Sequence, residues 1–573
     1  MEHTTLSGPG LQSASEQKQR RLALWLQFPR RVLFLLIAYG LGALLFLLLR
    51  GLLGAELARP GALFDWGRSL AFNQPVSEMV AERLPNTLLL LGIAFGCALL
   101  ISLITMVIAF FVHRLEARSA GWGFLLNRLG RLWIFGDIAL PSFALGLLLI
   151  WVFAIRLDLL PAFGLYSPES IGDPADRMQH LILPVCALVF VPAGLAAQAA
   201  ARRMRRAGQK GFRAWLAGIL NLLAGLFRQT GGVLGAAILT EIVFSLPGIG
   251  RMIYDAAARG DVPLLMGCAA AFAALVLAGR LLSELFGWLA CFADPEPAAP
   301  PEPDARLKKA RKAWLIFAAV LLVIVLAWTV YGATVSRDAA YEASPAERLA
   351  PPSAEHWLGT DPVGRDTWAR VARGAAITFG AAVIASGIAI FLAFPGGLLA
   401  GWLSRRRKWW ADLLADLTLL PADIALFLPV VVAGIILFLL TYDRDAPLIM
   451  PAVLTAVLIL PRMTRLMAQL WADAPDGKVL KRAGLSALVL FLGSLFAAFA
   501  VVTALSFLGF GIQPPAPSLG GILMETLRYL VTSSSEALAA ILALGIPLWI
   551  FYLAADALLD DWLGKDAMHW LNS

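Results

Sequence analysis

Charged side chains are scarce in this chain. Asp, Glu, Lys and Arg make up 15% of its 573 residues, whereas a soluble domain carries about 25%. Hydrophobic residues make up 59%. They gather in about a dozen apolar stretches, each close to the roughly 20 residues that a spanning helix needs. This composition excludes an ordinary soluble enzyme and a disordered chain, and it predicts an all-α polytopic membrane protein.

The chain also lacks the motifs of catalysis and of nucleotide binding. No G-x-x-x-x-G-K-[ST] sequence is present, so the chain has no P-loop to hold ATP phosphates. The four cysteines and five histidines never occur at metal-ligand spacing, and no G-x-S-x-G sequence occurs. We therefore expect no catalytic, cofactor-binding or metal-binding residues in this chain, and no disulfide framework.

The net charge of +8 comes mainly from Lys and Arg in short segments between the apolar stretches. This placement favours orientation in a lipid bilayer over binding of nucleic acid. If both termini and the polar segment at the centre of the chain face the cytoplasm, that side carries about twice as many Lys and Arg as the other side. The positive-inside rule therefore predicts cytoplasmic N- and C-termini.

The apolar stretches form two halves with the same plan. Each half has one span, then a long outside segment, about 50–85 in the first half and 333–376 in the second, and then five further spans. The twelve predicted spans run about 32–49, 86–112, 132–155, 181–201, 231–248 and 264–290, and then 314–332, 377–403, 411–440, 448–468, 485–507 and 536–558.

A polar segment separates the two halves. Residues 294–313 are rich in Pro, Ala and charged side chains, which cannot cross a bilayer and indicate a linker. The predicted divisions are a cytoplasmic tail at 1–31, a first six-helix repeat at 32–293, a cytoplasmic linker at 294–313 and a second six-helix repeat at 314–573.

A short signature recurs at the end of the fifth predicted span of each half. Residues 241–250 align without gaps onto residues 502–511. Two parallel repeats of this kind predict a pseudo-twofold axis along the membrane normal. The identical positions are Ser245 and Ser506, Gly248 and Gly509, and Gly250 and Gly511.

A series of short sequences resembles a known family. It includes 140–149, 160–164, 180–184, 241–250 and 259–263 in the first half, and 356–366, 505–515 and 556–560 in the second. The first set resembles one permease subunit of the dipeptide, oligopeptide and nickel ABC importers, and the second set resembles the other permease subunit of the same systems. The resemblance implies that two subunits, normally separate, are joined in this chain.

This resemblance implies a type I ABC importer fold and alternating access for peptides, nickel or other metal chelates, or related small solutes. It also implies a multi-pass position in the bacterial cytoplasmic (inner) membrane. The expected partners are two ABC ATPase subunits, or a fused ATPase, which would hold ATP and Mg, and an extracytoplasmic substrate-binding protein.

The signature at the end of the fifth span lies near the outer mouth of the pathway in the family, so the resemblance implies a gate. Plain helix termination by glycine is the alternative. Val502 stands where the family usually has Glu, which makes the two halves unequal in charge. The gate candidates are Glu241, Ser245, Gly248, Gly250, Ser506, Gly509 and Gly511.

The turn at 358–366 predicts a polar structure outside the membrane, because Gly359 and Gly364 stand among Asp and Pro. Its charged side chains, Asp361, Arg365 and Asp366, are candidates for docking of the substrate-binding protein. The alternative is that they pair with one another and cap the helix that follows.

The basic stretches between the fourth and fifth spans resemble the coupling helices that press on an ATPase. Both depart from the family pattern: Pro475 and Gly477 interrupt the second stretch, and the first is about ten residues shorter. Either the partner ATPase has diverged with them, or coupling is weakened. The candidate coupling residues are Arg205, Arg206, Gly211, Arg465 and Gly484.

Charges within the spans are expected to form ion pairs or to mark a pathway. Asp412 and Asp416 are within reach of the basic stretch at 405–408. Arg280 and Glu284, four residues apart, are expected to neutralise each other.

Two other classes of protein remain open. A secondary transporter with repeated halves would carry ion ligands in broken helices at mid-membrane depth. A membrane scaffold that has lost its ATPase would explain the altered coupling stretches.

Overall fold

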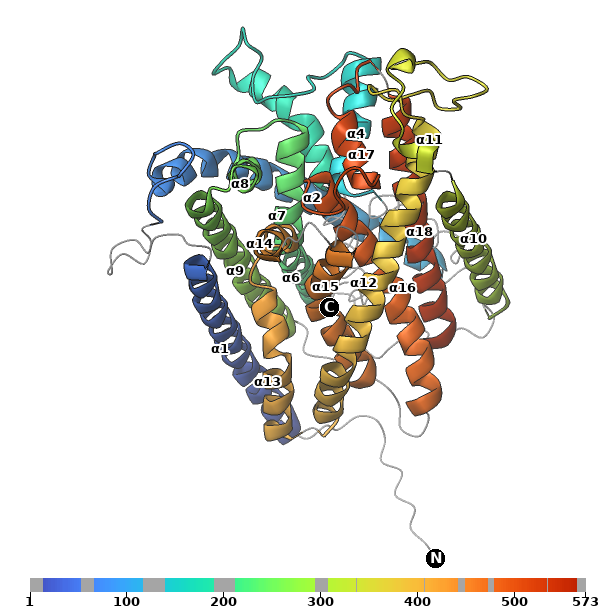
Figure 1. The fold of residues 1–573 in the computed structure, drawn as a ribbon. Helices are drawn as coiled ribbons and strands as arrows, with labels where there is room; N and C mark the ends of the chain where they lie inside the picture. Colours follow the sequence, from blue (N-terminus) through green and yellow to red (C-terminus); the bar gives the residue numbers. More distant parts are fainter. Residues whose placement is uncertain are drawn as a thin grey trace, which may run out of the picture.

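A computed structural model describes residues 14–52, 66–116, 140–189, 212–293, 308–335, 337–406, 408–441, 449–472, 479–532 and 534–563. In these parts the chain is a bundle of helices, and its only β pairing is two isolated bridges. Figure 1 shows the long helices side by side, with short helices and loops gathered at one end. The predicted all-α polytopic class is confirmed.

The first half contributes long helices, the short helix α8 and one helix that continues in π geometry. Residues 174–189 are also helical. The helices are α1 (Ala14–Leu52), α2 (Val76–Glu116), α4 (Ser142–Leu149) with η1 (Ile150–Arg156), α6 (Phe212–Arg228), α7 (Thr230–Val243), α8 (Ile249–Ala258) and α9 (Val262–Ala293).

The second half repeats this plan with a longer loop before its second long helix. Its helices are α10 (Lys308–Thr334), α11 (Arg337–Tyr341), η3 (Pro345–Glu347), α12 (Thr367–Ser404), α13 (Trp409–Ala425), α14 (Val430–Thr441), α15 (Ile449–Ala472), α16 (Val479–Phe507), α17 (Leu519–Thr526) and α18 (Ser535–Leu563). Helix α10 begins inside the predicted linker, whose residues 294–307 lie outside the described parts.

Eight helices in the described residues are long and apolar enough to cross a membrane, and two bent helix pairs bring the number to ten. Each of the ten contains or overlaps a predicted span. The other two predictions, 132–155 and 181–201, lie partly outside the described residues. The protein is therefore a multi-pass membrane protein, and the count of twelve spans stays a prediction.

The fifth span, predicted at 231–248, overlaps the helix Thr230–Val243. The residues before it, Trp215–Arg228, form a second apolar helix that the prediction did not include, and the two meet at a bend of 50°. Polar residues such as Asn221 conceal the first part in the sequence. The Asn221 side-chain amide donates to the Ala217 carbonyl oxygen at 2.7 Å, so the helix itself satisfies this polar group.

The third span of the second half is also bent. It was predicted as one helix over 411–440, but Trp410–Ala425 and Val430–Thr441 meet at 75°. Pro429 directly precedes the second part, and proline cannot donate the backbone hydrogen bond that would continue the first.

The two halves are interlocked rather than set side by side. Helix α1 of the first half packs on its own α9 and also on α13 of the second half. The ring of Phe427, between α13 and α14, meets the ring of Tyr39 at 5.2 Å between centroids. Gly42 lies under the same ring, where a side chain would lie 2.9 Å from it. A close contact of α1 therefore holds the bend in the other half.

Candidate gate and transport pathway

The candidate gate residues lie at the end of the bundle that carries the short helices α8 and α17, here called the loop end (Figure 1). There α7 ends in a Schellman motif. The Leu246 N–H donates to the Glu241 carbonyl oxygen at 2.8 Å, and the Ser245 N–H donates to Ile242 at 3.2 Å. Ser245 has φ of +55°, the left-handed conformation that this motif requires. Ser245 therefore reverses the chain, and α8 begins after Gly248.

The side chain of Glu241 is buried at the start of α8. Its carboxylate accepts the Thr87 hydroxyl at 2.7 Å and the Arg251 N–H at 3.0 Å. A carboxylate at a helix N-terminus is stabilised by the backbone donors and by the helix dipole. Glu241 thus caps α8 from the preceding helix.

Gly248 and Gly250 make room for this carboxylate. A Cβ at Gly248 would overlap the Glu241 carboxylate, and one at Gly250 would lie 2.6 Å from the Ile238 Cα. These glycines do not occupy the left-handed terminator position, which is Ser245. They let α8 cross closely over α7.

In the second half the left-handed position belongs to Gly509, with φ of +78°. The Phe510 N–H donates to the Leu505 carbonyl oxygen at 2.8 Å, and the Gly509 N–H donates to Ser506 at 3.1 Å. The two Schellman motifs therefore make Ser245 the structural equivalent of Gly509. The gapless sequence alignment pairs Ser245 with Ser506, so it is three residues out of register with the structure. The Ser506 hydroxyl accepts the Ile512 N–H at 3.1 Å, and Gly511 leaves room for this hydroxyl.

The short helices α8 and α17 occupy equivalent places in the two halves. The Thr87 hydroxyl accepts the N–H of Ile249, the first residue of α8, at 2.9 Å. The Thr378 hydroxyl accepts the N–H of Leu519, the first residue of α17, at 3.2 Å. The next residue in each helix is glycine, and a Cβ at Gly520 would overlap the Thr503 carbonyl oxygen. Gly520 is the spatial counterpart of Gly250, which the sequence comparison missed.

Aromatic rings close the space between the two halves beside these turns. Phe143 on α4 packs on Phe507 at the end of α16, with 4.7 Å between ring centroids. Phe510, in the second-half turn, lies 6.4 Å from Tyr254 on α8 and 5.5 Å from Phe438 on α14. Phe143 and Phe507 are fully buried. The signature turns thus carry an apolar closure of the interface, here called the aromatic closure.

The turn at 358–366 is held by Asp361, which is buried. Its carboxylate accepts the backbone N–H of Val363 and of Arg365, each at 2.9 Å, and the Arg365 Nε at 2.6 Å. The same carboxylate accepts a further bond from Arg370 on α12, at 2.5 Å. Burial raises the pKa of Asp361, and the nearby Arg370 guanidinium opposes that rise.

Arg370 extends this network to the last helix. Its guanidinium donates to Glu525 at 2.5 Å and lies 3.3 Å from Glu536, at the start of α18. The Tyr529 hydroxyl donates to Glu536 at 2.5 Å. Arg370 is buried, so these acidic partners compensate for the loss of water around its charge.

Asp366 is the N-cap of α12. Its carboxylate accepts the Ala369 N–H at 2.6 Å and lies 2.8 Å from the His356 Nδ1. The hydrogen bond with Asp366 raises the pKa of His356. The internal contacts that were one alternative for this turn are present. Docking of a binding protein stays a prediction, and Arg365, which is partly exposed, is better placed for it than Asp361.

The first half has a turn of the same shape that sequence reasoning missed. Gly67 and Gly359 have φ of +74° and +77°, and each carbonyl oxygen accepts the N–H of the first residue of the next helix, α2 or α12, at 3.0 and 3.1 Å. Ser69 stands in the place of Asp361. Its hydroxyl bonds to Asp261, which also accepts the Leu264 N–H in the first turn of α9, at 3.2 Å. In both halves this turn is tied to the start of the sixth span.

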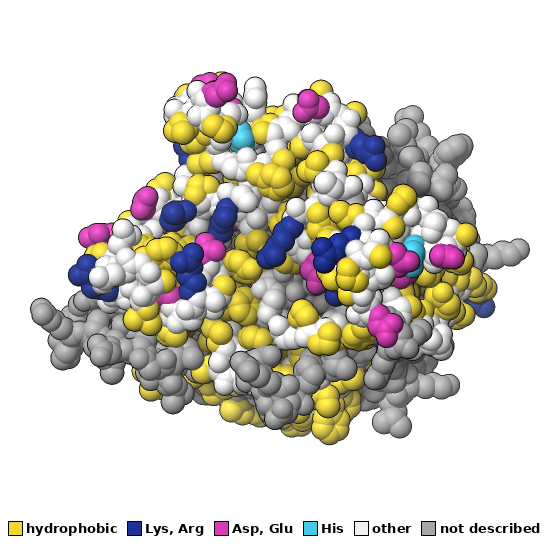
Figure 2. All heavy atoms as spheres, turned by 45° about the horizontal axis from the view of Figure 1, so that its top comes forward, with side chains coloured by type: hydrophobic (Ala, Val, Ile, Leu, Met, Phe, Trp, Pro, Cys, Tyr) yellow, Lys and Arg dark blue, Asp and Glu magenta, His cyan; other side chains and the backbone are white. Residues whose placement is uncertain are grey.

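The surface of the loop end mixes charge and apolar area. Figure 2 shows Lys, Arg, Asp, Glu and His side chains spread over this end, with hydrophobic side chains between them.

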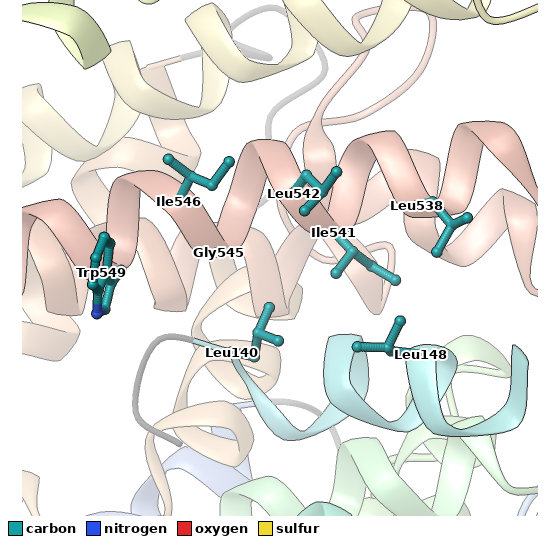
Figure 3. A pocket seen from close by; sticks show the side chains of 8 residues that line it. All are labelled: Leu140, Leu148, Leu538, Ile541, Leu542, Gly545, Ile546 and Trp549. Carbon is teal, nitrogen blue, oxygen red and sulfur yellow. The ribbon is translucent and has the colours of Figure 1, made fainter. Parts of the chain in front are cut away.

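An apolar hollow of about 430 Å³ lies between α4 and α18. In Figure 3, Leu148 on α4 and Ile541 on α18 face each other across it. The side chains that line it carry only one polar atom, the Trp549 indole nitrogen.

The candidate coupling residues are only partly described. Arg205, Arg206 and Gly211 lie outside the described residues, and Gly484 lies within α16. Arg465 lies in α15 and forms an ion pair with Asp423 on α13. Their role in coupling stays a prediction.

Two expected ion pairs have other partners. Asp416, expected to pair with the stretch at 405–408, pairs with Arg30 of the first half, because α1 crosses over α13. Glu284, expected to pair with Arg280, lies 3.6 Å from Arg31. Contacts between distant helices replaced the local ones.

Comparison with known proteins identifies the relatives of this chain. No model of a known protein family matches it. The oligopeptide transport system permease protein AppB of Bacillus subtilis is 29% identical over 239 residues, which are 39% of this chain and 73% of AppB. The chain is homologous to peptide-transport permeases.

Other relatives are also described as peptide or dipeptide permeases. A putative peptide permease protein of Brucella suis is 28% identical over 264 residues, 41% of this chain and 80% of the relative. The dipeptide transport system permease protein DppB of Alkalihalophilus pseudofirmus is 28% identical over 236 residues, 35% of this chain and 68% of the relative. Most of one such permease therefore corresponds to less than half of this chain.

Proposed function

We propose that this protein is the transmembrane subunit of an ATP-driven importer for peptides or related small solutes, nickel and other metal chelates included. The observation that carries the proposal is the homology to peptide-transport permeases, together with two matching gate turns that meet at one end of the bundle. ATP and Mg belong to partner ATPase subunits, and an extracytoplasmic binding protein delivers the solute.

The joining of two permeases in one chain is part of this proposal. The paired turns before α2 and α12, and the paired short helices α8 and α17, support two repeats within 32–293 and 314–573. A single relative accounts for about two fifths of the chain. The linker then fixes the pairing of the halves, whereas their packing comes from helix contacts.

Alternating access is part of this proposal, and the way the halves meet supports it. The aromatic closure joins α4 and α8 of the first half to α14 and α16 of the second. Moving the halves apart at the loop end would separate Phe143 from Phe507 and open the path there. Among the described residues no hydrogen bond joins these rings, so separating them breaks only apolar contacts between them.

The direct test is co-purification and ATP hydrolysis. The chain, expressed in its native host and extracted in mild detergent, should carry an ABC ATPase whose hydrolysis responds to peptide and binding protein. Gly484→Trp should lower this stimulated hydrolysis far more than Arg465→Ala, with normal membrane insertion of both. Purification without any ATPase would contradict the proposal.

A second candidate, a secondary transporter, is favoured by one observation, the two bent spans. Broken helices near mid-membrane form the ion sites of such transporters. The bend between α6 and α7, however, carries Arg228, and a guanidinium repels a coupling cation. Uptake that persists after ATP depletion and collapses with the ion gradient would favour this candidate.

A further inference from the structure

Helix α10 is covered by little of the rest of the chain. Its apolar window is 17% buried, the smallest share among the eight spans found in the described residues. In Figure 1 it stands at the edge of the bundle. Its outward side chains are apolar, with Ile324 at 56% and Val330 at 65% exposure. On a multi-pass membrane protein, an exposed apolar surface of this kind faces the hydrocarbon chains of lipid.

The apolar length of α10 matches the core of one bilayer. The span Leu315–Thr334 has 20 residues. At 1.5 Å per residue this is about 30 Å of helix, and the hydrocarbon core is also about 30 Å thick. Residues 308–312, mostly Lys and Arg, precede the span, and Trp328 and Tyr331 lie in its last two turns. The two ends of the span therefore lie close to the two lipid–water interfaces.

Four aromatic rings meet at the end of the span that carries Tyr331. Between ring centroids, Trp328 lies 5.7 Å from Tyr331 and 5.0 Å from Trp368, in the first turn of α12. Trp357, directly before the turn at 358–366, lies 5.4 Å from Trp368. The Trp368 indole N–H donates to the Tyr331 hydroxyl at 3.2 Å. These four rings are called the aromatic anchor below, and they join α10, α12 and the turn.

The aromatic anchor is open on its outer side. Trp357 is 63% exposed and Tyr331 is 44% exposed. Trp and Tyr combine an apolar ring with a polar group, so water is a poor environment for the ring, and hydrocarbon is a poor one for the polar group. Both requirements are met at the level of the lipid headgroups, where these residues are enriched in membrane proteins.

Hydrogen bonds fix the aromatic anchor to the turn and to the last helix. The Arg373 guanidinium donates to the Val335 carbonyl oxygen, directly after α10, at 2.6 Å. The Ser535 hydroxyl, at the start of α18, donates to the Leu358 carbonyl oxygen at 2.9 Å. The turn at 358–366 therefore takes its height above the bilayer from the same elements that carry the rings.

We propose that the aromatic anchor binds the headgroup and glycerol region of the lipid leaflet at the loop end, and that it holds the turn at 358–366 at the membrane surface. The partner is a lipid surface. The proposal rests on the multi-pass class of the protein and not on the proposed function. A protein that docks on this turn then also meets lipid headgroups.

The first test measures the depth of single positions in the membrane. The four native cysteines are replaced by serine. The full chain, with a nitroxide on one new cysteine, is placed in nanodiscs of phosphatidylcholine. Collisions of the nitroxide with oxygen report hydrocarbon, and collisions with a water-soluble nickel chelate report water.

Three positions are compared in this way. Ile324→Cys should collide mainly with oxygen, and Ile171→Cys, at a residue that is 80% exposed at the loop end, should collide mainly with the chelate. Trp357→Cys should give a ratio between these two. A ratio at Trp357→Cys equal to that at Ile171→Cys would overturn the proposal, because the rings would then face water, where a soluble protein could dock.

The second test asks whether the rings set the height of the turn. A nitroxide at Val363→Cys reports this height. Trp357→Ser with Tyr331→Ser should raise its collision rate with the chelate about twofold, because serine has no preference for the interface, whereas Trp357→Tyr with Tyr331→Trp should leave the rate unchanged. Trp402→Ser removes an exposed ring near the other end of α12 and is the matched control, with no expected change. An unchanged rate in the double serine variant would overturn the proposal.

Discussion

The two halves build the same turn from different chemistry. Before α2, the Ser69 hydroxyl meets Asp261 at the start of α9 directly. Before α12, Asp361 reaches Glu536 at the start of α18 only through the guanidinium of Arg370. Both halves therefore tie this turn to the sixth span. The first half uses one hydroxyl–carboxylate hydrogen bond, whereas the second uses the charge network together with the Ser535 hydroxyl, which donates to the Leu358 carbonyl oxygen at 2.9 Å.

The gate turns differ in the same way. In the first half the Glu241 carboxylate fills the space under α8 and takes the Thr87 hydroxyl. In the second half Leu505 holds the equivalent position in the turn, and the Thr378 hydroxyl donates instead to the Gly374 carbonyl oxygen of its own helix. The path of the backbone is shared, whereas the polar support is concentrated in the first half.

The largest expected effect distinguishes the contacts that join the turns before α2 and α12 to the sixth span of each half. Arg370→Met should destabilise the protein by about 3–5 kcal/mol, because Glu536 would be left buried without its cation and Asp361 would keep only Arg365. Ser69→Ala should cost about 1–3 kcal/mol, the loss expected for one buried hydrogen-bond partner. Thermal unfolding in detergent measures both variants. Equal losses would show that the charge network of the second half stabilises its turn no more than the single hydroxyl–carboxylate hydrogen bond does in the first half.

The next largest effect on stability is expected at the glycines where α8 and α17 lie close against the preceding helices. Gly250→Ala and Gly520→Ala should each cost about 1–3 kcal/mol, because the added methyl group meets backbone atoms of the preceding helix. Gly380→Ala and Gly493→Ala are matched controls, since a Cβ at either position meets nothing within 4 Å. The controls should be neutral or slightly stabilising. If only Gly250→Ala were harmful, the equivalence of α8 and α17 would fail.

The threonines give a smaller contrast. Thr87→Val removes a donor to Glu241 and an acceptor for Ile249, so we expect a loss of about 1–3 kcal/mol. Thr378→Val removes an acceptor for Leu519 only, since its own donor bond is local, and about 1 kcal/mol is expected. Thermal unfolding of the two variants side by side checks the order. A larger loss for Thr378→Val than for Thr87→Val would show that Glu241 does not stabilise the first-half turn.

The smallest effect depends on pH. The raised pKa of His356 means that its protonated form is stabilised beside Asp366. This contribution, below about 1 kcal/mol for a partly exposed pair, is complete below the unfolded pKa of about 6.5 and is lost as pH rises through the folded pKa. His356→Gln should flatten the unfolding temperature against pH between about pH 6 and 8. An unchanged pH profile would mean that the ion pair contributes nothing.

Sequence patterns predicted the helical class and most spans, because long apolar runs carry that information locally. Helix α6 was missed because Arg213, Asn221 and Arg228 interrupt its apolar run. The pairing of Asp361 with Arg365 is local, four residues apart, and was open to prediction. Arg370 with Glu525 was not, because 155 residues separate them and only the folded chain brings them together.

The relation between Gly250 and Gly520 was hidden for another reason. The strongest sequence match aligned Gly250 with Gly511, whereas α17 starts eight residues after Gly511. Insertion of the 512–518 loop moved the short helix without moving the signature. Identical residues in the sequence alignment therefore located the gate region, but they did not identify which positions of the two halves are structurally equivalent.

The central claim is that solute passes between the halves and that the aromatic closure bars its way. In a chain without its four cysteines, Phe143→Cys and Phe507→Cys are joined by a short bifunctional thiol reagent, and peptide uptake is measured in cells. The account predicts that cross-linking abolishes uptake and that cleaving the cross-link restores it. Phe379→Cys with Phe551→Cys, joined within the second half, serves as control and should leave uptake intact. Full uptake with the 143–507 cross-link in place would contradict the account.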